Sequence, residues 1–235
     1  MPTLYVLGGA NGVGKTTWYQ TGIENNAINL ELPFINLDTI IHHELGGYTS
    51  ENIAKGEQLA KERMATFIKE RKDFIIESNL SKSSDYDWME LMRKNGYETV
   101  LFFLGTIDVE INKKRVNARV NEGGHNVAEP IIEHRYRMGL SYLKSKVLNF
   151  SEATLIDVST HEARMVAHLQ KGQILYKEVE CPKWVQESLH IAERLEQKLR
   201  LTNNQTLKHH LNPQKKDLSE KQKNQIRLRN KGLGL

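Results

Sequence analysis

Short apolar runs alternate with longer amphipathic stretches along the first two thirds of the chain. The apolar runs cover residues 3–8, 34–37, 73–77, 99–104 and 153–158. Between them, hydrophobic residues recur at intervals of three or four in residues 53–71, 84–95, 109–120 and 130–148. Short buried strands that alternate with such helices indicate a parallel sheet covered on both faces. The pattern therefore predicts an α/β fold with a parallel sheet of about five strands flanked by helices.

The pattern changes after residue 159. Two short apolar runs, residues 163–169 and 173–179, flank Lys171-Gly172 and predict a terminal hairpin or a pair of edge strands. Apolar residues in 183–200 again step by three or four, which predicts a helix with one apolar stripe. Such a stripe usually packs on the body of a protein, and partner binding is the alternative. We expect a main domain over residues 1–180, a helix over 181–202 and a basic, flexible tail over 203–235.

Composition places the chain among soluble globular proteins. Of its 235 residues, 39% are hydrophobic and 26% are charged. No apolar run is long enough to span a bilayer, and the first strand begins almost at the first residue, so we expect neither a membrane partner nor a signal peptide. The single cysteine, Cys181, excludes an internal disulfide and a multi-cysteine metal site. We expect a cytoplasmic protein.

The net charge of +4 is spread unevenly. Residues 197–235 hold ten Lys and Arg against two Asp and Glu, a local charge of +8, so residues 1–196 carry −4. A body of that charge is not typical of a nucleic-acid-binding domain. We expect nucleic acid to bind, if at all, through the basic tail.

A glycine-rich loop directly follows the first apolar run. From Gly9 to Thr16 it fits the spacing G-x-x-x-x-G-K-[ST] of the phosphate loop, and a preceding strand is the context that this motif requires. Glycines let the backbone wrap around a polyphosphate with its N–H groups pointing inward. A glycine turn that happens to precede Lys15 and Thr16 is the alternative. We predict a site for a nucleoside triphosphate, with ATP as the ligand.

Each part of this loop has an expected role. Lys15 would lie between the β- and γ-phosphates, and the hydroxyl of Thr16 would hold Mg²⁺. A helix that begins near Lys15 would add the positive end of its dipole. The residues expected to bind ATP are Gly9, Ala10, Asn11, Gly12, Val13, Gly14, Lys15, Thr16 and Thr17.

Polar residues follow the second and third apolar runs, where the carboxyl ends of parallel strands meet the nucleotide crevice. Asp38 could accept a proton from an attacking hydroxyl while staying close to Mg²⁺. Glu77, Ser78 and Asn79 would supply the acceptors and donors that a hydroxyl-rich substrate needs. For Asp38, Ser78 and Asn79, capping of the following helix is the alternative.

Arginines flank a glycine corner further along the chain. Arg115 and Arg119 are four residues apart and share one helical face, and Arg135 follows the pair Gly123-Gly124. Two helices joined in this way predict a lid whose arginines neutralise charge on a moving phosphoryl group. A solvated basic face is the alternative.

Six segments, in order and together with the phosphate loop, resemble the zeta-toxin-like kinases of bacteria, in the branch also labelled predicted ABC-type ATPase. They are residues 34–38, 77–81, 96–100, 115–120, 123–127 and 135–136. The resemblance covers residues 3–160 and continues more weakly to 180. It implies a P-loop kinase fold with a five-stranded parallel core.

The best-known members of that family phosphorylate the amino sugar of UDP-N-acetylglucosamine. The resemblance therefore implies ATP and Mg²⁺ as cofactors, a hydroxyl of a small molecule such as a nucleotide sugar as acceptor, and an antitoxin as a candidate partner. Asp38 would be the base, with Lys15 and the γ-phosphate ligands Arg119, Arg135 and Arg115 beside it. The candidate substrate-binding residues are Glu77, Ser78, Asn79 and His125.

The chain departs from the family pattern at two places. The family's Val-Pro-Glu is Val127-Ala128-Glu129 here, with the proline moved to Pro130, where it still suits a first helical turn. Asp157 is followed by Val158-Ser159 in place of Asn-Ser, which weakens a role for that corner.

Two other function classes remain as alternatives to a kinase of small molecules. A nucleotide-dependent ATPase or switch that acts through partners is disfavoured, since no apolar strand ends in an Asp-Glu pair and no ABC-type signature segment is present. A nucleic-acid or nucleoside kinase is suggested only by the basic tail.

Overall fold

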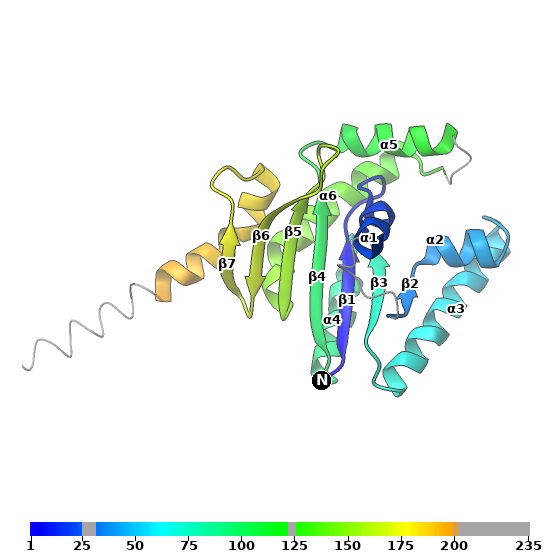
Figure 1. Cartoon of the computed structure of the whole chain (residues 1–235), viewed down its shortest axis with the longest axis horizontal. Coiled ribbons are helices and arrows are strands. Elements are labelled where there is room, and N and C mark those ends of the chain that lie inside the picture. The colour runs from blue at the N-terminus through cyan, green and yellow to red at the C-terminus, as the bar shows by residue number, and fades with distance from the viewer. Residues whose placement is uncertain (25–31, 122–125, 200, 202–235) are drawn as a thin grey trace, which may run out of the picture. The chain divides into compact units, whose positions relative to one another are not determined.

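The computed structural model describes residues 1–24, 32–121, 126–199 and 201 of the 235 residues. Strands of the described part form one seven-stranded sheet in the order β2-β3-β1-β4-β5-β6-β7 (Figure 1). The strands are β1 (Thr3–Gly8), β2 (Phe34–Ile35), β3 (Phe74–Ser78), β4 (Glu98–Gly105), β5 (Glu152–Asp157), β6 (Arg164–Gln170) and β7 (Gln173–Lys177).

The first five strands run parallel, which confirms the predicted core. β1 lies between β3 and β4, with Val6 opposite Ile76 on one side and Leu101 on the other. The order 2-3-1-4-5 brings the carboxyl ends of β1, β2 and β3 to the same edge of the sheet. Polar segments that follow these strands therefore meet there, although they are far apart in sequence.

The last two strands form the predicted hairpin at the sheet's far side. β6 pairs antiparallel with β5, and β7 pairs antiparallel with β6. The turn between them places Lys171 at φ 49° and Gly172 at φ 77°, the backbone that a tight hairpin turn uses. The hairpin extends the sheet on the side away from β2.

Helices cover both faces of the sheet, with α1 in front of it and α4 and α6 behind it in the view of Figure 1. The bounds are α1 (Lys15–Glu24), α2 (Leu37–Thr39), the π-helical turn η1 (Ile40–Glu44), α3 (Ser50–Lys69), α4 (Ser83–Lys94), α5 (Val109–Asn121), α6 (Glu129–Lys146) and the 3-10 turn η2 (Val147–Asn149). None of the helices described is long and apolar enough to cross a membrane.

One predicted strand is shorter than expected. The apolar run at residues 34–37 gives a strand of only two residues, and Leu37 already begins α2. The cause is Asn36, whose side chain accepts a hydrogen bond from the backbone N–H of Thr39 and so caps a helical turn. Asp38 consequently lies in the first turn of a short helix and not on a strand.

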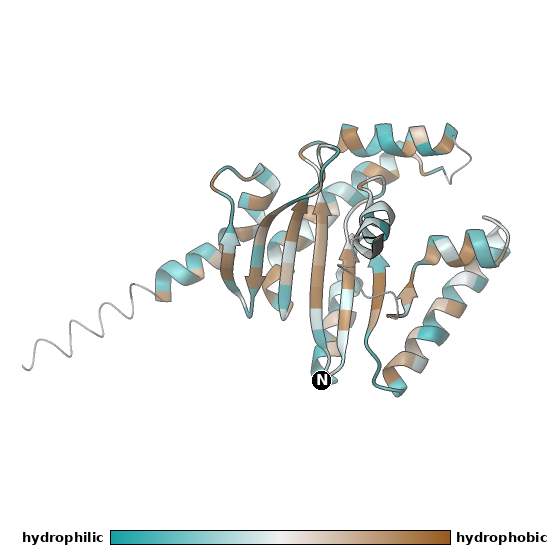
Figure 2. Ribbon diagram, viewed as in Figure 1, coloured by the Kyte–Doolittle hydropathy of each residue, from teal (hydrophilic) through white to brown (hydrophobic). Residues whose placement is uncertain are grey.

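The core follows from the apolar runs. β4 is hydrophobic along most of its length (Figure 2), and Leu101, Phe103 and Leu104 are fully buried. The central strand β1 buries Leu4, Val6 and Leu7. A strand that is apolar on both faces needs cover on both sides, which the helices supply. The sheet is thus a rigid base for the segments at its carboxyl edge.

The chain divides into two units, Met1–Ala192 and Glu193–Leu235. In the first, residues 183–192 are helical, and Trp184, Val185 and Leu189 are buried in the main core cluster. This confirms packing on the body for the part of the apolar stripe in residues 183–192, whereas Leu195 and Leu199 are exposed. In the second, residues 193–199 and 201 are helical. The predicted basic tail, residues 203–235, lies outside the described residues.

Trp184 tests how much this helix contributes to stability. Its indole, 6% exposed, lies against Gly105 and Phe103 at the end of β4. We expect Trp184→Ala to lower the free energy of unfolding by about 3–5 kcal/mol, because it leaves a large cavity. Urea denaturation measures the change, with the exposed Ile191→Ala on the same helix as control. A loss below 1 kcal/mol would show that the helix is not an integral part of the core.

Candidate functional site

The loop after β1 packs closely against the backbone of two neighbouring segments and needs glycine at two positions. Gly9 has φ 138°, and a Cβ there would lie 2.4 Å from the carbonyl oxygen of Leu104. Gly12 has φ 74°, and its Cβ would lie 2.3 Å from the carbonyl oxygen of Asn112 on α5. At Gly14, by contrast, a Cβ would meet nothing within 4 Å. The loop is therefore held firmly from behind and open at Gly14.

Lys15 closes the loop on itself. Its ammonium group donates to the carbonyl oxygens of Gly9 at 2.6 Å and Ala10 at 3.2 Å. It also lies 3.6 Å from a carboxylate oxygen of Glu77 and 3.4 Å from Oδ1 of Asn79. Burial lowers the pKa of Lys15, and the charges of Glu77 and Asp38 oppose this shift.

Helix α1 begins at Lys15, as predicted, and its first turn contains no acidic residue. The positive end of the helix is therefore not neutralised by a side chain of its own. Thr16 and Thr17 are exposed in this first turn. Together with the loop, this is a backbone arrangement that fits a polyphosphate.

Glu77, at the end of β3, connects the loop to the segment after β2. Its Oε2 accepts a hydrogen bond from Nδ2 of Asn36 at 2.7 Å and lies 3.4 Å from the hydroxyl of Thr16. Asn36 is buried and also caps α2. One amide therefore fixes both the carboxylate of Glu77 and the helical turn that carries Asp38. The alternative role of Asp38 as helix cap is wrong, since Asn36 has that role.

Asp38 shares its surroundings with Tyr48 and Arg119. Burial raises the pKa of the Tyr48 hydroxyl, and Asp38 raises it further through its charge and a side-chain hydrogen bond. The guanidinium of Arg119, which comes from α5, lowers the same pKa. The fold thus brings together a base candidate and an arginine candidate that are 81 positions apart in the sequence.

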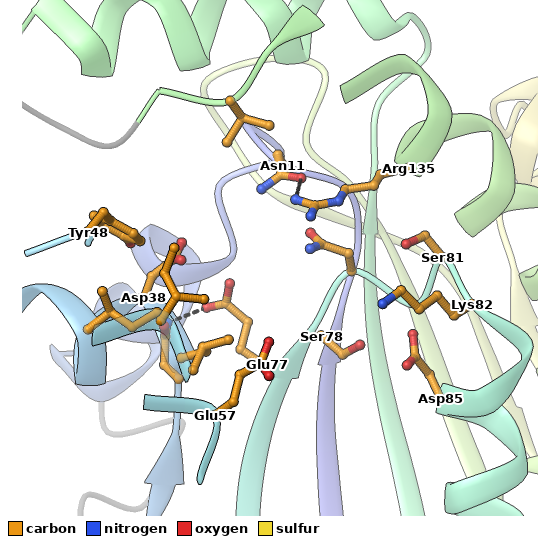
Figure 3. A pocket seen from close by; sticks show the side chains of 16 residues that line it. Asn11, Asp38, Tyr48, Glu57, Glu77, Ser78, Ser81, Lys82, Asp85 and Arg135 are labelled. Carbon is orange, nitrogen blue, oxygen red and sulfur yellow. Dashed lines mark hydrogen bonds between the residues drawn. The ribbon is translucent and has the colours of Figure 1, made fainter. Parts of the chain in front are cut away.

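A cavity of about 390 Å³ opens beside the loop (Figure 3). In Figure 3, Asn11 and Arg135 lie at one end of it, Asp38 and Tyr48 lie on one side, and Lys82 and Asp85 lie on the other. Its walls are formed by Asn11, Asn36, Leu37, Asp38, Ile41, Tyr48, Ile53, Glu57, Glu77, Ser78, Asn79, Ser81, Lys82, Asp85, Val127 and Arg135. The cavity therefore runs from the phosphate loop to the candidate base.

The arginines of the predicted lid are placed differently from one another. Arg135, on α6, donates to Oδ1 of Asn11 in the loop at 2.8 Å. Arg115, on α5, donates to the carbonyl oxygens of Val158 at 2.8 Å and Thr160 at 3.1 Å. Arg135 therefore faces the loop and the cavity, whereas Arg115 binds backbone beyond β5 and also donates, at 3.5 Å, to the carbonyl oxygen of Val13 in the loop. Which of them contacts a γ-phosphate stays a prediction.

A lysine joins the two helices that carry these arginines. Lys113 on α5 is largely buried and forms ion pairs with Glu110 at 2.7 Å and with Glu133 of α6. The hydroxyl of Tyr136 on α6 donates to the carbonyl oxygen of Thr106 at 2.8 Å. These contacts hold α5 and α6 together as one piece, although the glycine corner and His125 lie outside the described residues.

The polar residues after β3 line the cavity and do not cap α4. Ser78 accepts a hydrogen bond from the N–H of Leu80 at 3.1 Å, and the residue preceding α4 is Lys82, without a side-chain cap. Burial raises the pKa of Asp85, and Lys82 and Ser78 oppose this shift.

Sequence reasoning missed ten of the sixteen residues that line the cavity, among them Tyr48, Glu57, Lys82 and Asp85. No motif marks them. Glu57 lies on α3, and Asp85 lies in the first turn of α4. Their position depends on which face each helix turns to the sheet edge, and this follows from packing.

The donor groups present fit Mg²⁺ and ATP. The Thr16 hydroxyl and the Glu77 carboxylate are oxygen ligands of the kind that Mg²⁺ takes beside phosphate oxygens. Gly14 leaves room at the loop, and Lys15 supplies the cation for a phosphate. The predicted roles of these residues are consistent with the geometry.

Comparison with solved structures finds the same fold in two complexes. The crystal structure of AvrRxo1-ORF1 and -ORF2 with ATP has a TM-score of 0.58 and 17% identity, over 74% of this chain and 60% of that chain. The PezAT toxin-antitoxin system of Streptococcus pneumoniae has a TM-score of 0.52 and 17% identity, over 85% and 87%. At these identities the likeness concerns the fold alone.

Sequence comparison reaches further. An uncharacterized protein of Haemophilus influenzae is 42% identical over 69 residues, which are 29% of this chain and 49% of that protein. The match spans about half the length of this curated relative. A model of the AAA domain family matches residues 4–137, which is more than half of the chain. With the phosphate loop, the parallel sheet and the solved structures of like fold, this match shows that the chain belongs to the AAA domain family and has a P-loop, kinase-like fold.

Proposed function

We propose that this protein is an ATP-dependent kinase that transfers the γ-phosphoryl group of ATP to a hydroxyl of a small molecule. One observation carries the proposal: a single cavity of about 390 Å³ touches both the phosphate loop, at Asn11, and a carboxylate, Asp38. Donor and acceptor would meet inside it. A cavity of this size suits a small molecule.

The chain's own residues would divide the work as follows. The loop would bind ATP through Lys15 and Mg²⁺ through Thr16. The Lys15 ammonium and Mg²⁺ would then neutralise charge on the phosphates. Asp38 accepts the proton of the acceptor hydroxyl. Arg135, which lies beside the loop, and Arg119, which lies near Asp38 and Tyr48, stabilise the transferring group. Arg115 acts through the backbone that it binds.

Glu77 lies between the phosphate loop and the cavity that would hold the acceptor. It lies within reach of Lys15 and Thr16 and lines the cavity. We therefore propose that Glu77 serves both the metal and the acceptor, together with the neutral groups of Ser78 and Asn79. The role predicted for His125 stays a proposal that the described residues do not address.

A partner protein belongs to the proposal only as a candidate. The PezAT structure is described as a toxin-antitoxin system, and the resemblance to zeta-toxin-like kinases implies an antitoxin. The same resemblance makes UDP-N-acetyl sugars one class of acceptor to assay. We also keep the cytoplasm as the proposed location, because the free Cys181 fits a reducing compartment.

The proposal is tested by incubating the full chain with labelled ATP, Mg²⁺ and a panel of sugars, amino sugars, nucleosides and UDP-sugars, followed by mass spectrometry. We expect one acceptor to gain 80 mass units, about the mass of a phosphoryl group added in place of a proton. Hydrolysis of ATP that no acceptor changes, but that a protein partner stimulates, would favour an ATPase switch instead. Transfer to RNA 5′-hydroxyls alone would favour a polynucleotide kinase.

A further inference from the structure

The two halves of the site differ in charge. Around the phosphate loop the charged groups include the cations Lys15 and Arg135. The cavity as a whole, whose lining includes Arg135 and Glu77 from the loop side, has four carboxylates, Asp38, Glu57, Glu77 and Asp85, against two cations, Lys82 and Arg135. The lining therefore has an excess of two negative charges. This is unexpected for a site that would take a phosphate-bearing acceptor.

The two cations of the lining are already occupied. Arg135 donates to Asn11 of the loop, which directs its guanidinium toward the donor. Lys82 lies near Asp85, where its charge opposes the upward pKa shift that burial gives this carboxyl. Glu77 is matched by Lys15 at 3.6 Å, and Asp38 lies near Arg119, so among the described residues Glu57 is the carboxylate of this lining without a cation beside it.

Glu57 is the clearest excess charge. It lines the cavity from α3, where it is exposed to solvent, and it has no hydrogen bond or ion pair with another residue of the described chain. A carboxylate that faces a binding cavity without a partner offers two acceptor oxygens to hydroxyl or ammonium groups. It also repels a phosphate or a carboxylate brought close to it.

The rest of the lining suits a polyhydroxylated molecule. The side chains of Ser78, Asn79 and Ser81 are neutral donors and acceptors, whereas the amide of Asn36 is already bound to Glu77 and Thr39. Leu37, Ile41, Ile53, Val127 and the ring of Tyr48 supply apolar surface for the carbon skeleton. A volume of about 390 Å³ lies at the lower end of the range for ligand pockets, which is enough for one or two sugar-sized rings.

We infer that the acceptor is an uncharged or amine-bearing polyhydroxy compound without phosphate or carboxylate groups, and that Glu57 and Asp85 determine this charge preference. The inference rests on the proposed function and narrows its acceptor. UDP-sugars and sugar phosphates would be poor acceptors, although they offer similar hydroxyls. Glu57 and Asp85 are specificity residues that touch the acceptor away from the reacting hydroxyl.

The test compares three ligands that share one ring: glucosamine, N-acetylglucosamine and N-acetylglucosamine 1-phosphate, which are cationic, neutral and anionic at pH 7. Their dissociation constants are measured by equilibrium dialysis against the full chain with Mg²⁺ and a non-hydrolysable ATP analogue. We expect the anionic sugar to bind at least tenfold more weakly than glucosamine, with N-acetylglucosamine in between. Equal or tighter binding of the anionic sugar, or binding of none of the three, would overturn the inference.

Charge-neutralising variants show whether the named residues cause this order. Glu57→Gln and Asp85→Asn should each narrow the affinity ratio of glucosamine to the 1-phosphate about three- to tenfold, and Lys82→Gln should widen it. Glu51→Gln removes the same charge from α3 outside the cavity and should leave the ratio unchanged. If the affinity ratio of glucosamine to the 1-phosphate changes equally in Glu57→Gln and Glu51→Gln, Glu57 has no specific role. A general disturbance of the fold would weaken the binding of both ligands and leave this ratio unchanged.

Turnover separates this inference from the proposed function. If the expected order of binding is found but labelled ATP transfers no phosphoryl group to any bound sugar, the charge preference stands and the kinase proposal fails. If UDP-N-acetylglucosamine is phosphorylated with a lower KM than N-acetylglucosamine, the kinase proposal stands and the charge preference is wrong.

Discussion

Asp38→Asn is expected to lower kcat for phosphoryl transfer by about 10²–10⁴-fold while the Kd for ATP changes less than threefold. The amide keeps the size of the carboxyl group and cannot accept the proton of the acceptor hydroxyl. Asp38 lines the cavity next to Tyr48, and its backbone position is set by the Asn36 cap, which the substitution leaves intact. The loss should therefore appear in catalysis and not in folding or nucleotide binding.

The measurement combines a steady-state assay, with whichever acceptor the panel identifies, and titration calorimetry with ATP and Mg²⁺. Asp87→Asn on α4 is the matched control, since that carboxylate is exposed and is not part of the cavity lining. Full transferase activity in Asp38→Asn would eliminate Asp38 as the base. Loss of ATP binding in the same variant would show that Asp38 acts on the donor side.

Lys15→Met is expected to weaken ATP binding by roughly 30-fold or more, which corresponds to about 2 kcal/mol. It should also lower kcat by about 10²-fold or more, because it removes the cation that the loop itself places at the phosphate that moves. In the unliganded protein the Lys15 ammonium is held by the carbonyl oxygens of Gly9 and Ala10, and methionine cannot make these bonds.

Because Lys15 is only 6% exposed, its loss could also disturb the loop. Urea denaturation of the same variant separates the two effects, and Lys94→Met on the exposed face of α4 is the control for charge alone. Unchanged ATP affinity in a folded Lys15→Met protein would contradict the assignment of residues 9–16 as the phosphate loop.

The parts of this site that lie close together in sequence could be predicted without a structure. The phosphate loop is contiguous, and its strand, its glycines and the helix that begins at Lys15 all lie within residues 3–24. The meeting of Asp38 and Glu77 could also be predicted, because parallel strands in one sheet end at one edge.

Other parts depend on tertiary packing. Asn36 reads as a polar residue at the end of a strand, but its amide both caps α2 and binds Glu77, and no pattern in one segment shows this. Glu57 lies on a helix with exposed charges all along it, and only the packing of α3 decides that this one faces the cavity. Arg115 fits an arginine lid by spacing, yet the turn of α5 directs it to backbone carbonyls.

The two hydrogen bonds of the Asn36 side chain have a consequence for how ligand binding at one part of the site affects the other part. Its amide nitrogen is bound to the carboxylate that faces Lys15 and Thr16, and its amide oxygen holds the turn that carries Asp38. A ligand that draws Glu77 toward the loop would therefore move the Asn36 amide, and with it the helical turn that holds Asp38 in place. By reciprocity, an acceptor that reorients Asp38 alters the affinity for nucleotide by the same factor. We therefore expect the proposed donor and acceptor sites to be thermodynamically coupled through one side chain, so that the dissociation constant of each ligand depends on whether the other is bound.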